Sequence, residues 1–305
     1  MDTRTYRGRF APSPSGPLHF GSLVAAVGSY LDARANGGEW LVRIEDLDQP
    51  RTAPGAAEAI LQALEALGMA WDGAVMYQST RDDAYREALA TLKKSGLVYP
   101  CSCSRREIAD SAVNGIDGPV YPGTCRKGLL AGRAARADRL LTQGARVEFE
   151  DAVQGRIVHN IERQIGDFVL KRADGPYAYQ LAVVVDDAAQ GITDIVRGAD
   201  LLDSTPRQIY LQQRLGYATP RYAHLPVAVN VVGEKLSKQT LAAPVALANP
   251  VAVLNAALAF LGQDAIADCA VQDTQSFWQQ AITGWRLDRV PRTRSLHAPE
   301  LPGIR

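Results

Sequence analysis

The first 67 residues repeat the order strand, loop, helix, and this alternation constrains the fold more than any other feature of the chain. The pattern predicts strands over Tyr6–Phe10 and Trp40–Ile44. A helix is expected after each strand, over Phe20–Ala35 and from Pro54 to about Leu67. Such alternation is typical of a parallel sheet covered by helices. We therefore expect an α/β fold.

The rest of the chain divides at a change of composition near Cys101. The stretch from there to about Gly144 is rich in cysteine, glycine and arginine and is interpreted as an inserted sub-domain. We expect the first half of the core over residues 1–100, the insertion over 101–145, the second half over 146–240 and a short helical extension over 241–305. Further expected elements are helices over Arg81–Ser95, Thr205–Leu215 and Val251–Leu261, strands over Ile192–Val196 and Leu225–Val232, and a polar loop over Gly233–Gln239.

Bulk properties exclude some classes of protein. With 305 residues and 47% hydrophobic content, the chain is long enough for one catalytic body with insertions. No apolar run approaches the roughly 18 residues of a membrane span, and the first ten residues are charged and polar, so we expect a cytoplasmic protein without membrane contact.

Net charge is zero, with 33 basic and 33 acidic residues, so any nucleic acid must be bound by local patches. Each candidate patch is explained equally well as a solvated helix face. The candidates are Arg105 and Arg106, then Arg126 and Lys127, then Arg133, Arg136 and Arg139, and finally Arg286, Arg289, Arg292 and Arg294.

The turn before the first helix is a candidate phosphate site. A helix N-terminus offers unpaired N–H groups and a positive dipole end, and glycine lets a ligand approach the backbone closely. This turn contains Gly16, His19 and Gly21. An imidazole there donates to a phosphate as charge develops, although a histidine that only caps the helix is the simpler alternative.

A second candidate phosphate site lies near the other end of the chain. Lys235 and Lys238 flank Ser237 in the polar loop, and the whole chain has six lysines. Two ammonium groups on one loop suit the stabilisation of departing pyrophosphate.

These two segments resemble the signature motifs of class I aminoacyl-tRNA synthetases. Pro14–Ser22 resembles the HIGH motif, with Ser22 in place of its second histidine, and Lys235–Gln239 resembles KMSKS, with Leu236 and Gln239 as departures. The resemblance implies a Rossmann-like catalytic core that uses ATP with Mg²⁺. It implies that His19 and Lys238 are catalytic and that ATP contacts Ser15, Gly16, His19, Gly21, Lys235, Ser237 and Lys238.

Two further segments, Arg9–Pro14 and Arg43–Asp48, narrow the resemblance to the glutamyl and glutaminyl subclass. Glutamate carries two carboxylates and one ammonium group, so its pocket needs guanidinium groups and at least one carboxylate. The resemblance implies that glutamate contacts Arg9, Phe10, Ala11, Pro12, Ser13, Glu45, Tyr179 and Arg197.

Two alternatives remain open within this pocket. Only one of Tyr177 and Tyr179 is expected to face it, and we choose Tyr179. If instead Arg9 and Arg197 pair with Asp46 or Asp200, the two arginines only brace the fold.

Three of the four cysteines, Cys101, Cys103 and Cys125, lie within 25 residues, whereas Cys269 stands alone. Three thiolates and one more ligand form a closed zinc site, and buried free cysteines are the alternative. No histidine lies between His19 and His159, so the residues themselves leave the fourth ligand open among Tyr121, Asp117, Asp110 and Glu107. The spacing is similar to that of glutamyl-Q tRNA(Asp) synthetases, and this resemblance implies Tyr121.

Only 66 residues follow Gln239, where full-length glutamyl-tRNA synthetases carry an anticodon-binding domain, so no such domain is expected. The shortened chain resembles the glutamyl-Q tRNA(Asp) synthetases. That resemblance implies activation of glutamate without tRNA and transfer of glutamate to queuosine in the anticodon loop of tRNA(Asp). We expect a monomer. The alternatives are a short glutamyl-tRNA synthetase that charges a tRNA 3′ end and an inactive paralogue that binds tRNA.

Overall fold

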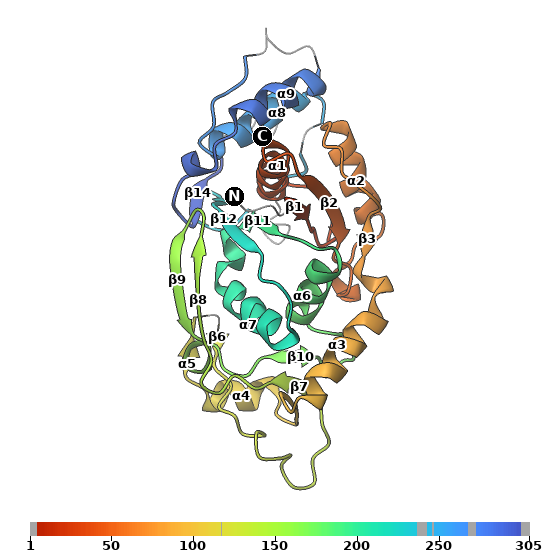
Figure 1. Ribbon diagram of the computed structural model, residues 1–305, viewed down its shortest axis with the longest axis vertical. Coiled ribbons are helices and arrows are strands. Elements are labelled where there is room, and N and C mark those ends of the chain that lie inside the picture. The colour runs from red at the N-terminus through yellow and green to blue at the C-terminus, as the bar shows by residue number, and fades with distance from the viewer. Residues whose placement is uncertain (1–4, 117, 237–242, 246, 268–272, 300–305) are drawn as a thin grey trace.

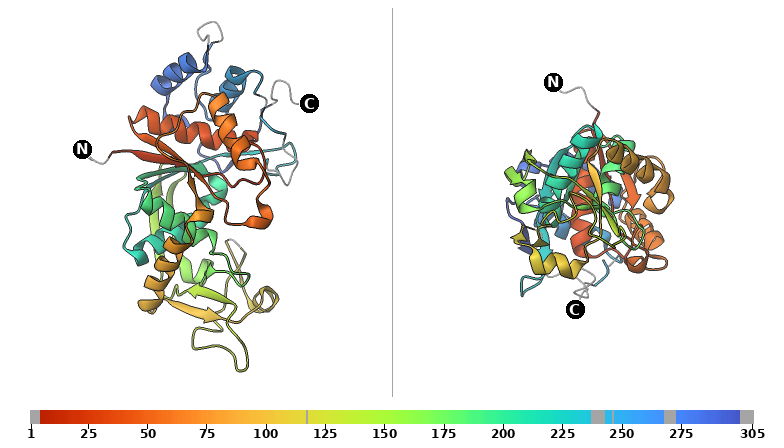
Figure 2. Two further views of the ribbon diagram at one scale, coloured as in Figure 1. Left: turned by 90° about the vertical axis from the view of Figure 1, so that its right-hand side faces the viewer. Right: turned by 90° about the horizontal axis from the view of Figure 1, so that it is seen from below.

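The computed structural model describes residues 5–116, 118–236, 243–245, 247–267 and 273–299. The molecule is elongated, with α8 (Pro250–Phe260) and α9 (Thr274–Gly284) at one end and the cysteine-containing insertion near the other (Figures 1 and 2). No helix in the described residues is long and apolar enough to cross a membrane.

Along much of the sequence, helices and strands follow one another in alternation. The other helices are α1 (Phe20–Ala35), α2 (Ala56–Ala66), α3 (Asp82–Lys94), α4 (Arg105–Ser111), α5 (Ile161–Gln164), α6 (Tyr179–Ala189) and α7 (Thr205–Leu215), with short 3₁₀ turns η1 (Gln49–Arg51), η2 (Gln78–Thr80), η3 (Ala199–Ser204) and η6 (Leu287–Arg289). The strands are β1 (Arg7–Phe10), β2 (Glu39–Ile44), β3 (Met76–Tyr77), β4 (Val98–Cys101), β5 (Asn114–Gly115), β6 (Gly118–Pro119), β7 (Ala137–Leu140), β8 (Arg146–Asp151), β9 (Gly155–Asn160), β10 (Val169–Lys171), β11 (Asp194–Gly198), β12 (Arg221–Leu225), β13 (Val227–Val229) and β14 (Ser295–His297).

Parallel strands form the centre of the molecule. β1 pairs in parallel with β2, and β2 with β3. β11 pairs in parallel with β12, which meets β8 at Tyr222 and Asp151. A backbone hydrogen bond of 3.0 Å from Thr193 to the Arg7 carbonyl brings the start of β11 beside β1. The predicted parallel α/β architecture is therefore confirmed.

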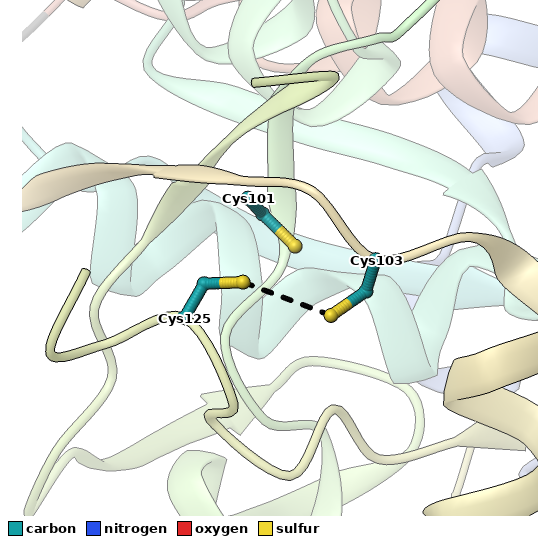
Figure 3. Close-up of side chains that lie close together, drawn as sticks. All are labelled: Cys101, Cys103 and Cys125. Atoms are coloured by element: carbon teal, nitrogen blue, oxygen red, sulfur yellow. Dashed lines mark hydrogen bonds between the residues drawn. The ribbon is translucent and has the colours of Figure 1, made fainter. Parts of the chain in front are cut away.

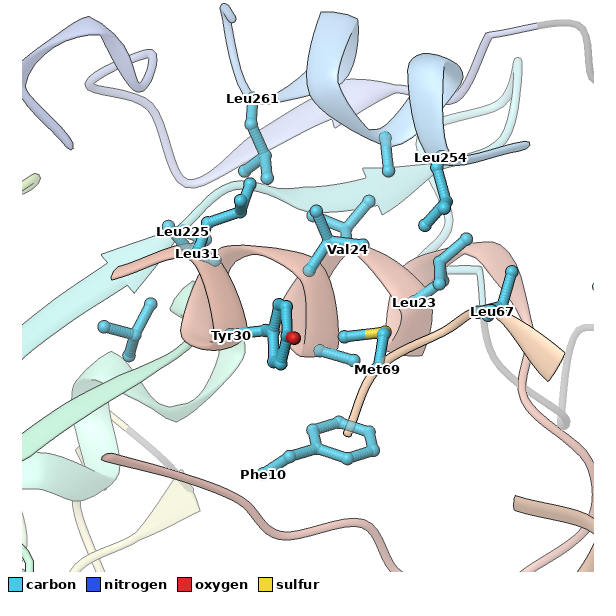
Figure 4. Close-up of a cluster of buried hydrophobic side chains, with 14 of the residues drawn as sticks. Phe10, Leu23, Val24, Tyr30, Leu31, Leu67, Met69, Leu225, Leu254 and Leu261 are labelled. Atoms are coloured by element: carbon cyan, nitrogen blue, oxygen red, sulfur yellow. The ribbon is translucent and has the colours of Figure 1, made fainter. Parts of the chain in front are cut away.

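The first core surrounds α1 (Figure 4). Leu23 and Leu31 are fully buried on this helix, and Leu225 from β12 and Leu254 from α8 pack against the same cluster. Gly28 allows the contact with the sheet, because a Cβ there would lie 2.4 Å from a methyl carbon of Leu225. This packing fixes the N-terminus of α1 relative to the strand ends.

A second core lies on the other side of the sheet, where α3, α6 and α7 pack together (Figure 1). Tyr85 and Leu181 are fully buried there. The antiparallel sheet of β4, β7 and β10 borders this core and leads into the insertion. The insertion is thereby attached to the same framework as the parallel strands.

The expected strand over Leu225–Val232 is interrupted. Proline has no N–H to donate, and Pro226 separates β12 from β13. β13 turns instead to a parallel pairing with β14, from the chain's last described segment. The helical start of α6 at Tyr179 was not among the expected elements, because its continuous apolar run has no helical periodicity.

Candidate active site

A cavity of about 890 Å³ lies at the carboxyl ends of β1 and β11. In open parallel sheets, ligands bind at this edge. Most of the residues predicted to bind ligand line this one cavity, namely Arg9, Phe10, Ala11, Pro12, Ser13, Ser15, His19, Gly21, Tyr179, Arg197 and Lys235. Segments separated by more than 200 positions in the sequence therefore meet around one space.

The N-terminus of α1 opens toward this cavity. His19 is the N-cap residue: its Nδ1 accepts from the Ser22 N–H at 3.3 Å, and the Ser22 hydroxyl accepts from the His19 N–H at 2.9 Å. Ser22 thus completes a capping box. His19 therefore caps the helix through Nδ1, as the simpler alternative proposed. The same residue also lines the cavity, so capping does not exclude contact with a ligand.

The preceding turn depends on Gly16, whose φ of 145° lies in the region that favours glycine. Gly21 permits a close approach, because a Cβ there would lie 3.2 Å from the Leu236 carbonyl oxygen. The start of the lysine loop therefore passes directly over the first turn of α1.

Lys235 donates to an Asp200 carboxylate oxygen at 2.5 Å. It lines the cavity, but a phosphate at that position must compete with Asp200 for its charge. Ser237, Lys238 and Gln239 lie outside the described residues.

Arg9 and Glu45 belong to a buried network of charges. Asp187 accepts from Arg9 Nε at 3.0 Å and from Arg43 Nη1 at 2.8 Å, and Arg43 also donates to Glu45 at 3.2 Å. Burial alone raises the pKa of Asp187, but Arg43 and Arg9 outweigh it and lower that pKa. Burial raises the pKa of Glu45, and Arg43 and Arg9 offset only part of this increase. Glu45 is not among the cavity-lining residues; its N–H bonds to the Pro12 carbonyl in the wall at 2.9 Å.

Arg197 is held differently. It donates from Nε to His224 at 3.0 Å, and from Nη2 to Thr205 and Gln208 at 2.7 Å each. Its Nη1 is buried and has no hydrogen-bond partner among the described residues. Arg197 is also one of the residues that line the cavity, and a buried donor without a partner is a place where an acceptor is expected.

The sequence left open that Arg9 and Arg197 pair with Asp46 or Asp200 and only brace the fold. These pairings are absent among the described residues. Asp46 accepts from Ser79, and Asp200 accepts from Lys235. Arg9 pairs with Asp187 instead.

Tyr179 and Tyr177 point into different surroundings. Tyr179 is the first residue of α6 and lines the cavity. Tyr177 packs against Tyr85 in the second core, with 5.6 Å between ring centroids. The two residues separate because the helix begins between them, with Ala178 as its N-cap.

Cys101, Cys103 and Cys125 form a compact cluster in the insertion (Figure 3). Their sulfur atoms lie within 4.8 Å of one another, with 3.7 Å between Cys103 and Cys125. A tetrahedral zinc with Zn–S bonds of about 2.3 Å separates its ligand atoms by about 3.8 Å, so the spacing fits.

Tyr121 is the candidate fourth ligand that adjoins this cluster. Its hydroxyl lies 3.4 Å from Cys101 Sγ and 3.6 Å from Cys103 Sγ. Glu107 instead pairs with Arg133, and Asp110 lies 3.9 Å from Arg106. Asp117 lies outside the described residues, as does Cys269.

Several residues at the site were not anticipated. Asp187 connects Arg9 to Arg43, and Asp151 supports His224, which contacts Arg197. Arg51 also lines the cavity. The pair Asp186-Asp187 inside an apolar segment was the available signal, since carboxylates are buried only when paired.

Comparison with known proteins agrees with this geometry. The family described as class I tRNA synthetases (E and Q), catalytic domain, matches residues 5–249. A glutamyl-Q tRNA(Asp) synthetase of Aromatoleum aromaticum is 59% identical, over 96% of this chain and 93% of that protein. One of Dechloromonas aromatica is 60% identical, over 96% and 98%.

A solved structure is also similar. It is a glutamate tRNA ligase from Elizabethkingia meningosepticum in complex with its amino acid, with a TM-score of 0.77 and 26% identity. The match covers 97% of this chain and 67% of that one. The predicted Rossmann-like synthetase fold is confirmed, and such an enzyme implies ATP with Mg²⁺ as a substrate. The chain is therefore a ligase of the class I tRNA synthetases for glutamate and glutamine, and it belongs to the family of glutamyl-Q tRNA(Asp) synthetases.

Proposed function

We propose that this protein activates glutamate with ATP in the absence of tRNA and transfers it to queuosine in the anticodon loop of tRNA(Asp). The observation that carries the first step is the buried Nη1 of Arg197, which has no hydrogen-bond partner among the described residues; Arg197 and Arg9 line the same cavity at the N-terminus of α1. A carboxylate is the acceptor that a buried guanidinium binds best. Glutamate supplies two, and Glu45 lies nearby to receive its ammonium group.

In the first step, a carboxylate oxygen of glutamate attacks the α-phosphorus of ATP. The bond from that phosphorus to the bridging oxygen breaks, and pyrophosphate leaves with its electron pair. His19 and Lys238 are proposed to stabilise the charge that develops on the phosphates, with ATP lying along Ser15, Gly16, Gly21, Lys235 and Ser237. In the second step, a queuosine hydroxyl attacks the carbonyl carbon, loses its proton, and AMP leaves.

Activation is tested by glutamate-dependent exchange between ATP and labelled pyrophosphate, without tRNA. We expect exchange in the isolated protein. Lys238→Ala should lower the rate by on the order of 100-fold, with little change in the glutamate KM, because the ammonium acts on the transition state. Lys94→Ala, at an exposed position on α3, is the matched control. Exchange that appears only after tRNA is added contradicts the proposal.

We further propose that Cys101, Cys103, Tyr121 and Cys125 bind one structural zinc ion. The sulfur spacing and the adjacent phenol oxygen support this set. Metal ligands must be deprotonated, so zinc would hold three thiolates and connect β4 to the loop of Cys125.

Elemental analysis tests the zinc proposal. We expect about one zinc ion per chain in freshly purified protein, and its loss in Cys125→Ser, together with faster hydrogen exchange in residues 101–136. Cys269→Ser leaves the three clustered thiols intact and should keep the metal. The zinc proposal is refuted if wild-type protein contains no metal and residues 101–136 are still protected from hydrogen exchange.

The acceptor is proposed from the named relatives, which this chain covers over 93–98% of their length. Nuclease digestion after reaction with labelled glutamate locates the product. Label on the anticodon nucleoside of queuosine-containing tRNA(Asp) supports the proposal. Label on the 3′-terminal adenosine favours the second candidate, a short glutamyl-tRNA synthetase, which the similar glutamate tRNA ligase suggests.

A further inference from the structure

The two arginines of the proposed glutamate pocket have partners of opposite kinds. Arg9 is bound by the carboxylate of Asp187, which reduces the positive charge that it offers a ligand. Arg197 donates only to an imidazole, a hydroxyl and an amide among the described residues, from His224, Thr205 and Gln208. Three hydrogen bonds thus fix its guanidinium while direct contacts leave its charge uncompensated.

His224 has a defined orientation because Asp151 holds its other nitrogen. The Asp151 Oδ2 lies 2.6 Å from His224 Nδ1, and both side chains are fully buried. Asp151 Oδ1 accepts backbone N–H groups of Val153, Gln154 and His224, at 2.8 to 3.1 Å. The carboxylate lies where β8 meets β12, and it cannot turn without losing these backbone hydrogen bonds.

The hydrogen-bond roles then follow from chemistry. A guanidinium nitrogen can only donate, so His224 Nε2 accepts from Arg197 Nε. The Thr205 hydroxyl also lies 3.0 Å from this nitrogen, but its own proton goes to the Leu201 carbonyl. The imidazole is therefore neutral and carries its proton on Nδ1, where Asp151 accepts it. A carboxylate behind an imidazole fixes the tautomer in this way.

We propose that Asp151 and His224 are positioning residues for Arg197: they present a neutral acceptor that orients its guanidinium and leaves Nη1, with its charge, for a substrate carboxylate. This inference rests on the proposed function, because it takes glutamate as the occupant.

The surroundings keep His224 neutral in the range where enzymes are assayed. Burial lowers its pKa to about 4, the Asp151 hydrogen bond opposes that shift, and Arg197 adds to it. The charged and titratable groups that face it come from four elements: Asp151 from β8, Arg197 from β11, Tyr222 from β12 and Asp200 from η3. A protonated imidazole would place two donors, and two positive charges, against each other.

The first test reads the tautomer directly in wild-type protein, by ¹⁵N chemical shifts of the imidazole rings. The chain has only four histidines, and His159→Gln and His297→Gln assist the assignment. We expect His224 to be neutral with its proton on Nδ1 from pH 5.5 to 8.5. A proton on Nε2, or a charged ring at pH 6.5, overturns the inference without reference to activity.

The second test uses Asp151→Asn. The amide oxygen must replace Oδ1, which accepts three backbone N–H groups, so the amide NH₂ faces His224 Nδ1. The ring then carries its proton on Nε2, against the Nε–H of Arg197. We expect the glutamate KM to rise on the order of 10- to 100-fold, with kcat and the ATP KM nearly unchanged.

A pair of variants separates positioning from general damage. His224→Gln keeps an acceptor near the Nε2 position, whereas His224→Asn keeps only the group that faces Asp151. The glutamine variant should restore most of the glutamate affinity that the asparagine variant loses, and His159→Gln should behave as wild type. Folded Asp151→Asn and His224→Asn proteins with a wild-type glutamate KM overturn the inference. If wild-type protein shows no glutamate-dependent exchange, the proposed function fails, and the tautomer measurement still decides the positioning.

Discussion

At the scale of single residues, the partner of each buried charge decides what a ligand has to supply. Asp187 is shared by Arg9 and Arg43, and Arg43 in turn holds Glu45. The motifs placed Arg9 and Glu45 at one site, but no spacing in the sequence links either of them to a carboxylate more than 140 positions away. Such pairings depend on which side chains the fold buries together, and local patterns do not contain that information.

His224 also makes folding stability depend on pH. Its pKa is about 4 in the folded protein and 6.5 when unperturbed, so between these values the unfolded chain binds more protons. Its contribution to stability is complete above pH 6.5 and is lost as the pH falls toward 4. We expect wild type to lose up to about 1.4 kcal/mol per pH unit more than His224→Gln in this window. Urea unfolding of wild type and of His224→Gln at pH 4.5 to 7.5 measures this difference. If the free energy of unfolding depends on pH in the same way in both proteins, the expectation is wrong.

At the scale of elements, the sequence predicts a helix or strand best where an amphipathic segment lies between clear turn residues. The predicted helices over Phe20–Ala35 and Thr205–Leu215 are confirmed at both ends. The helix α6 was missed because its apolar run from Leu181 to Val185 is unbroken and shows no helical periodicity, and β14 because its pairing partner lies 68 positions earlier. The candidate site depends on both kinds of segment, since α6 contributes Tyr179 and β1 contributes Arg9.

The packing of α1 gives a prediction for an element. Gly28→Ala should destabilise the protein by about 1 to 3 kcal/mol, because its methyl group overlaps Leu225 in a filled core. Gly284→Ala, at the end of α9, is the matched control. Outside its own helix backbone and chain neighbours, no atom of the described residues lies within 4 Å of its Cβ position, and alanine favours a helix by about 0.5 to 1 kcal/mol. Thermal unfolding compares the two. Equal effects would show that α1 moves to accommodate the methyl group.

At the scale of the whole molecule, each of the predicted basic patches contains at least one arginine that pairs with a carboxylate of the protein itself. Arg289 pairs with Asp264, Arg294 with Asp203 and Arg126 with Asp167. Net charge and clusters of arginine in a sequence do not reveal such pairs. Arg105 and Arg106 lie on exposed turns of α4 beside the cysteine cluster. Arg106 has only a long, solvent-exposed contact of 3.9 Å with Asp110, so these two arginines are the stronger candidates for phosphate contacts.

We therefore expect the double variant Arg105→Ala and Arg106→Ala to weaken transfer to tRNA while leaving activation unchanged. Each lost phosphate contact should reduce the slope of log K against log salt by about 0.9. Arg289→Ala, whose partner is Asp264, is the control and should leave that slope unchanged. Titrations of transfer activity between 50 and 200 mM salt measure it. A wild-type slope in the double variant would show that tRNA docks on another surface of the protein.

The pairing of β13 with β14 has a consequence for how the protein is made. Val227–Val229 leads directly to Lys235, yet its parallel partner is Ser295–His297. Chains emerge from the ribosome N-terminal end first, at about 5 to 20 residues per second, and domains fold as they appear. β1, α1 and β2 are therefore synthesised about 200 positions before β13 and long before β14. The parallel pairing of β13, which supports the segment leading to Lys235, can form only after β14 has been made.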